Sequence, residues 1–218
     1  MFLVSGFCSL VYQLVWLRVA MAEFGVTTAM ASIVLSVFMA GLALGSWAAG
    51  ALASRWQSAP AGRPLRLYAL AEAGIALGAF VVVRCLTYGH LRMAVGAAGL
   101  EWGSASYHAA AAAWVTLGML PFCVCMGATM PLGMWAIRRL VPDATRTSFS
   151  FLYVANVVGA ILGTTTTAFF LIELLGFRST LVLAAGLNLC LAGAAVALST
   201  RTRPAPSSSG AAMTAPTS

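Results

Sequence analysis

Six runs of apolar residues, each about 20 residues or longer, occupy most of this 218-residue chain. A helix of that length crosses the ~30 Å hydrocarbon layer of a bilayer. Charged residues make up 8% of the chain, against about 25% in soluble domains. The sequence therefore predicts an all-α integral membrane protein, a polytopic bundle of six transmembrane helices embedded in the lipid bilayer. The expected spans are 2–24, 27–52, 65–86, 111–137, 149–175 and 179–198.

These spans are expected to form one domain, residues 1–199, followed by a tail of different composition, residues 200–218. The tail is rich in Pro, Ser, Thr and Ala, so it cannot bury a core and is predicted to be disordered. The first span contains the sequence Ala20-Met21-Ala22, which is typical of a signal-peptidase site. No basic residue precedes that span, so we expect a retained helix.

The arginines predict the orientation of the chain in the membrane. In a six-span topology, eight arginines fall on one side and four on the other. The eight are Arg55, Arg63, Arg66, Arg138, Arg139, Arg146, Arg201 and Arg203. Cytoplasmic loops are enriched in Arg, so both termini are expected in the cytoplasm of a multi-pass protein of the bacterial inner membrane. The same rule accounts for the net charge of +7, and no nucleic-acid partner is expected.

Polar side chains inside the apolar runs are the candidates for function, because such groups are costly in lipid and usually face a bundle interior or cavity. Glu72 is the best candidate for binding a cation or a proton. The candidate cavity residues are Glu72, Gln13, Tyr12, Trp16, Asn156 and Asn188. The alternative is purely structural, with interhelical hydrogen bonds from Gln13 or Glu72 to Asn156 that hold the bundle together.

Glycine and proline patterns predict how the helices pack. Three pairs have the G-x-x-x-G spacing that lets helix backbones approach closely in lipid; they are Gly41 and Gly45, Gly74 and Gly78, and Gly159 and Gly163. Pro121 and Pro131 fall in one span and are expected to kink it, with Thr129 available to bond a freed carbonyl. Two interpretations stay open here, a helix that is merely bent and a broken helix that lines a cavity.

We predict no metal site and no cofactor. Cys123 and Cys125 form a C-x-C pair, but no His or acid clusters beside them. His90 and His108 are too far apart in sequence to have metal-ligand spacing.

Four segments, in order along the chain, resemble the membrane domain of the fused MFS/spermidine synthase (polyamine aminopropyltransferase-like) family. They are Ser5–Arg18 (SGFCSLVYQLVWLR), Phe38–Ser46 (FMAGLALGS), Met126–Leu132 (MGATMPL) and Leu152–Ala160 (LYVANVVGA), and Gly176–Thr180 resembles the turn that follows. Two positions depart from the family's pattern. Gln13 stands where the family often has Glu, and Ser54 replaces the usual Asp of the loop between the second and third helices.

The resemblance implies a bundle like half of an MFS transporter. It also implies a synthase domain after the bundle, which we expect this chain to lack, so we do not expect an enzyme. One hypothesis is a transporter-like protein that binds or moves a small solute, such as a cationic, polyamine-like one, and works as a homodimer or with a membrane partner. The other is a non-catalytic anchor or scaffold for a larger complex or for a separately encoded synthase-like partner.

Overall fold

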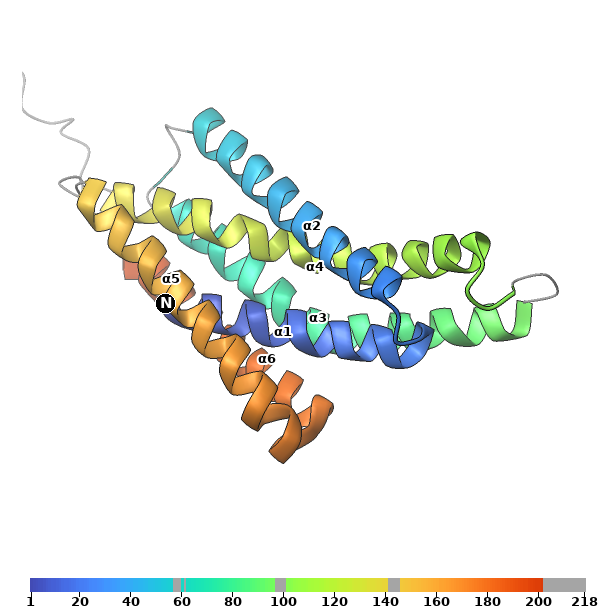
Figure 1. Ribbon diagram of the computed structural model, residues 1–218. Coiled ribbons are helices and arrows are strands. Elements are labelled where there is room, and N and C mark those ends of the chain that lie inside the picture. Colours follow the sequence, from blue (N-terminus) through green and yellow to red (C-terminus); the bar gives the residue numbers. More distant parts are fainter. Residues whose placement is uncertain (57–59, 61, 97–100, 141–145, 202–218) are drawn as a thin grey trace, which may run out of the picture.

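The computed structural model describes residues 1–56, 60, 62–96, 101–140 and 146–201, and these residues fold into long helices (Figure 1). The elements are α1 (Phe2–Phe24), α2 (Thr28–Arg55), α3 (Gly62–Gly96), α4 (Ala105–Leu140), α5 (Arg146–Thr166), the π-helical turn η1 (Thr167–Leu171) and α6 (Ile172–Arg201). The tail prediction falls almost wholly on residues outside the described part, although residues 200 and 201 still belong to α6.

Five helical segments are long and apolar enough to cross a membrane, which indicates a multi-pass membrane protein. They are Phe2–Phe24, Thr28–Arg55, Gly62–Val95, Ala105–Leu140 and Phe149–Arg201. The predicted count of six is not confirmed, because the expected spans 149–175 and 179–198 belong to a single 53-residue segment. Inside that segment Gly176 has φ 74° and ψ 171°, backbone angles that are essentially restricted to glycine.

The helices α3 and α4 are longer than the predicted spans 65–86 and 111–137. They contain 35 and 36 residues, or about 50 Å each at 1.5 Å per residue. Figure 1 shows their green ends projecting together beyond α1 and α2. The rings of Tyr88 and Trp114 join the two helices there, with centroids 5.7 Å apart in an edge-to-face arrangement.

Two helix pairs make backbone-to-backbone contact at glycines. A methyl group added at Gly45 of α2 would overlap the carbonyl oxygen of Val124 in α4. One added at Gly159 of α5 would overlap the carbonyl oxygen of Leu3 in α1. These contacts leave no room for any side chain at the two glycines.

The other predicted packing glycines also lie at helix contacts. Their neighbours are Cys123 for Gly41, Cys125 for Gly74, Phe122 for Gly78 and Phe7 for Gly163. Gly74 and Gly78 of α3 face side chains rather than backbone, so α3 and α4 approach each other less closely than the two glycine-mediated pairs do.

The helix α4 continues through both Pro121 and Pro131. Pro131 has no amide hydrogen, so the carbonyl of Gly127, four residues earlier, loses its usual partner. The hydroxyl of Ser46 in α2 donates to that carbonyl oxygen at 2.9 Å. Thr129, which was predicted to bond a carbonyl freed by proline, donates instead to the carbonyl of Met126 at 2.7 Å.

Candidate functional site

A carboxylate is buried where α1, α3 and α6 meet. Glu72 of α3 is 0% exposed, and each of its carboxylate oxygens accepts one hydrogen bond. The Ser5 hydroxyl of α1 donates to Oε1 at 2.9 Å. The Asn188 amide nitrogen of α6 donates to Oε2 at 2.6 Å. A single acidic side chain therefore links three helices that are far apart in sequence.

Three aromatic side chains extend this group along α1 and α3. Tyr68 lies one turn before Glu72 on α3, and its hydroxyl faces the carboxylate, although no hydrogen bond of good geometry is formed within the described residues. The hydroxyl of Tyr12 lies close enough to Glu72 for the two groups to interact electrostatically. The rings of Tyr12 and Trp16 have centroids 5.1 Å apart, and both side chains are fully buried.

Several polar atoms of this group have no hydrogen-bond partner within the described part of the chain. They are Tyr12 Oη, Tyr68 Oη, Trp16 Nε1 and Asn188 Oδ1. Each buried, unsatisfied polar group costs about 1–3 kcal/mol. All four atoms lie in the group around Glu72. A small polar ligand or a proton bound there would therefore stabilise this part of the fold.

The charge of Glu72 is not balanced by a basic side chain. Within the described residues, the two groups that donate to the carboxylate, the Ser5 hydroxyl and the Asn188 amide, are neutral, and no arginine or histidine is hydrogen-bonded to it. An isolated charge inside a protein is strongly disfavoured unless it is neutralised or paired. The surroundings of Glu72 therefore favour the uptake of one positive charge.

Four of the six predicted site residues, Glu72, Tyr12, Trp16 and Asn188, lie buried at this interface. The other two do not join the hydrogen-bonded group. Gln13 is half-buried, and no described hydrogen bond links it to Glu72.

Asn156 lies between α5 and α1, where its Oδ1 would be 2.8 Å from a Cβ placed at Gly6. The predicted hydrogen bonds to Asn156 from Gln13 or Glu72 are therefore not the ones observed. Glu72 bonds Ser5 and Asn188 instead, because Asn156 packs on a different side of α1.

Ser5 and Tyr68 were not predicted as site residues, yet the sequence contains a signal for both. Ser5 precedes Tyr12 by two helical turns and therefore lies on the same side of α1. Tyr68 precedes Glu72 by four residues and shares its face of α3. This helical spacing placed Ser5 on the side of the first span that was expected to face the bundle interior, and the same comparison on α3 would have found Tyr68.

Within the described residues, no group of three or more His, Cys, Asp or Glu is arranged to hold a metal ion. Cys123 is buried and Cys125 is partly buried, and both are free thiols. The C-x-C pair serves packing, since Gly41 and Gly74 rest against these two side chains.

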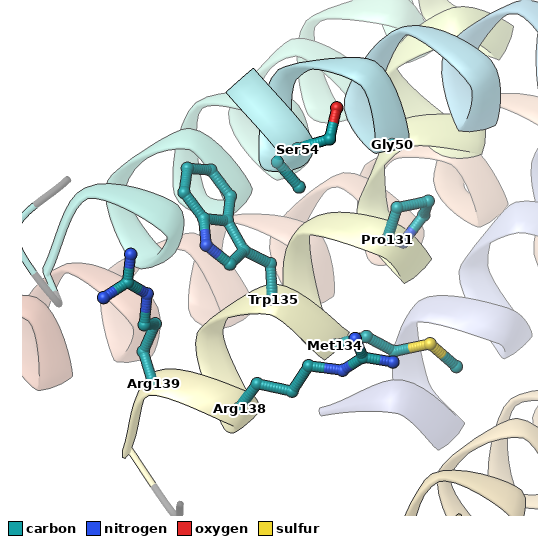
Figure 2. A pocket seen from close by; sticks show the side chains of 8 residues that line it. Gly50, Ser54, Pro131, Met134, Trp135, Arg138 and Arg139 are labelled. Atoms are coloured by element: carbon teal, nitrogen blue, oxygen red, sulfur yellow. The ribbon is translucent and has the colours of Figure 1, made fainter. Parts of the chain in front are cut away.

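Two cavities lie at opposite ends of the bundle. One of about 540 Å³ opens beside Glu23, Arg84 and Arg178, where α1, α3 and α6 meet again. Its lining residue Ala79 is seven residues from Glu72 on α3, or about 10 Å along the helix axis. The other, of about 640 Å³, lies between the ends of α2 and α4 (Figure 2).

Comparison with models of protein families, with curated proteins and with solved structures finds no match to this chain. The resemblance to the fused MFS/spermidine synthase family therefore stays a prediction. The function is therefore inferred from the geometry of the Glu72 group.

Proposed function

We propose that this chain is a transporter-like membrane bundle of six spans that binds one positive charge, a proton or a small monovalent cation, at Glu72. The observation that carries the proposal is a buried carboxylate that has no basic partner among the described residues and lies next to an unpaired acceptor, Asn188 Oδ1. A bound cation or donor would satisfy both groups at once.

The length of the last helical segment supports the proposal of a sixth span. Its 53 residues would extend about 80 Å as one continuous helix, while the hydrocarbon layer is ~30 Å thick. Gly176 interrupts the segment near its middle. The Thr180 hydroxyl then donates to the carbonyls of Leu171 and Gly176 at 3.0 and 2.8 Å. A chain reversal at Gly176 gives two spans of ordinary length.

The number of acids favours a ligand with a single charge. Of the acids in the described part of the chain, Glu23, Glu101 and Glu173 are not buried and Glu72 alone is. A polyamine-like solute carries several charges, and only one of them would find a carboxylate here. A proton, an alkali cation or a primary ammonium matches the site better.

The cavity beside Glu23 is the route by which a ligand would reach Glu72. It lies at the α1–α3–α6 interface, and Ala79 and Leu181 in its lining each stand two helical turns from a member of the Glu72 group. Trp16 and Tyr12 lie on α1 between that cavity and Ser5. Small rearrangements of these two aromatic side chains would connect the cavity to the carboxylate.

Thermal unfolding in lipid nanodiscs tests the proposal. The wild type, Glu72→Gln and Glu173→Gln are compared over a pH series and with Na⁺, K⁺, methylammonium and spermidine. Glutamine preserves the size of the side chain and removes its charge, and Glu173 is an exposed control. A ligand at 100 times its Kd raises the unfolding free energy by about 2.7 kcal/mol.

We expect a shift of the melting temperature with pH or with one monovalent cation in the wild type and in Glu173→Gln, and none in Glu72→Gln. Shifts that are equal in all three proteins would refute the proposal. A larger response to spermidine than to every monovalent cation would refute the single-charge part of it.

A further inference from the structure

The cavity between the ends of α2 and α4 has a structural origin. Glycines hold the two helices in backbone contact near their middles, as at Gly45. At Gly50 an added Cβ would meet nothing within 4 Å, and Figure 1 shows the cyan end of α2 diverging from α4. The resulting space of about 640 Å³ is lined by Gly50, Ala53 and Ser54 of α2 and by Pro131, Met134 and Trp135 of α4, with Arg138 and Arg139 beside them.

Two guanidinium groups border this space (Figure 2). Arg138 stacks on the ring of Phe149 in α5, with its Cζ 4.9 Å from the ring centroid, a contact that orients the group without using its N–H donors. Arg139 reaches up beside Trp135, whose indole nitrogen is turned to the Arg139 side in Figure 2. Among the described residues, no acid pairs with either arginine.

The described helix ends around this cavity carry further basic side chains. Arg55, Arg63, Arg66 and Arg201 lie at neighbouring helix ends. The described acids, Glu23, Glu72, Glu101 and Glu173, lie elsewhere. These arginines attract anions to the region of the cavity.

We infer that the α2–α4 cavity is a binding site for the headgroup of an anionic phospholipid. Arginine is well suited to phosphate oxygens because its planar donors bind them in pairs. Pro131, Met134 and Ala53 offer an apolar lining on which the glycerol and the start of an acyl chain can lie. The volume falls within the ~300–1,000 Å³ range of small-molecule sites.

A lipid is favoured over a soluble phosphate because the cavity lies at the end of membrane-spanning helices and combines cationic with apolar walls. The inference does not depend on the proposed role of Glu72, which is buried in a different interface. We therefore expect that loss of lipid binding in the α2–α4 cavity leaves cation binding at Glu72 intact, and the reverse.

Native mass spectrometry tests the site with phosphatidylglycerol, phosphatidylcholine and inorganic phosphate as probes. The variant Arg138→Gln/Arg139→Gln is compared with Arg66→Gln/Arg201→Gln, a control that removes the same charge from exposed positions at the same end. We expect the cavity variant to bind phosphatidylglycerol about 10-fold more weakly than the control variant, beyond the general attraction of basic residues for anionic lipid. Equal losses in the two variants would overturn the inference, and inorganic phosphate that displaces the lipid fully at millimolar concentration would overturn the lipid assignment.

Hydrogen–deuterium exchange on the wild type keeps the test valid if the cavity variant does not fold. Phosphatidylglycerol, and not phosphatidylcholine, is expected to slow exchange in residues 131–140 more than in the rest of α4. Protection that is the same for both lipids, or that is spread evenly over the helix, would contradict the site.

Discussion

The α2–α4 interface and the α1–α3–α6 interface use opposite means of holding helices together. In the first, glycine lets one backbone rest on another, as Gly45 does on the carbonyl of Val124. In the second, the contact is made by side chains, and a buried acid, Glu72, bonds Ser5 and Asn188 across three helices. Close fit of the two backbones determines the first interface, whereas the second contains buried polar atoms without a hydrogen-bond partner.

Both kinds of contact hold helices together in an apolar solvent. In lipid, burial of apolar surface does not drive helices together, so close packing of small residues and interhelical hydrogen bonds must do so. Within the described residues, the glycine contacts of the first interface leave no buried side-chain polar atom without a partner, and its arginines lie at the open end of the helices. The second interface offers a buried carboxylate and an unpaired amide oxygen, and for this reason we assign cation binding to it.

The largest effect is expected at the glycine contacts. Gly45→Ala places a methyl group on the carbonyl of Val124, and the helices must move apart, at a cost of about 3 kcal/mol of unfolding free energy. Gly186→Ala in α6 is the control, because an added Cβ there meets nothing within 4 Å. That variant should be neutral or more stable by up to about 1 kcal/mol, through helix propensity. Equilibrium unfolding in mixed micelles measures both, and equal values would remove the distinction between the two interfaces.

Removing a partner of the buried acid should have the next largest effect. Asn188→Ala leaves Glu72 Oε2 without its donor, so we expect a loss of about 2 kcal/mol. Asn156→Ala, at the α1–α5 contact outside the Glu72 group, should cost less than about 1 kcal/mol. The same unfolding assay compares them, and a larger loss from Asn156→Ala would show that the hydrogen bonds to Glu72 add little.

A smaller loss is expected where α2 compensates for a proline in α4. Ser46→Ala removes the donor to the Gly127 carbonyl that Pro131 leaves free, and should cost about 1 kcal/mol. Ser54→Ala is the matched control, since the Ser54 hydroxyl bonds Ala51 of its own helix in an exposed position. No difference in melting temperature between these two variants would mean that the freed carbonyl needs no protein partner.

The smallest effect on stability, and the most informative one, is expected at Tyr68. Tyr68→Phe removes a buried hydroxyl that lacks a good hydrogen bond, so stability should stay constant or rise by up to about 1 kcal/mol. Cation-dependent stabilisation should fall if the hydroxyl helps to hold the ligand. Tyr153→Phe, at an exposed position of α5, should change neither property. A destabilised Tyr68→Phe would indicate a structural role instead.

The sequence predicted the membrane class and the polar residues at depth, because apolar runs and costly buried groups can be recognised without a structure. It did not predict the partners of Glu72. Ser5 and Asn188 lie 67 and 116 positions away along the chain, and which face of α1 meets α3 or α5 depends on glycine contacts such as that of Gly159 with Leu3. The lengths of α3 and α4 were underestimated, because an apolar run indicates only the part of a helix that crosses the hydrocarbon layer and not the helical turns beyond it.

Infrared difference spectroscopy of the carboxyl C=O stretch tests the central claim most directly. Wild type and Glu72→Gln are recorded in lipid over a pH series, and again on addition of each monovalent cation. The account predicts a band of a protonated carboxylic acid that changes with pH or with one of the cations in the wild type and is missing from Glu72→Gln. Wild-type and Glu72→Gln spectra that respond identically to every pH and cation would contradict the uptake of a positive charge at Glu72.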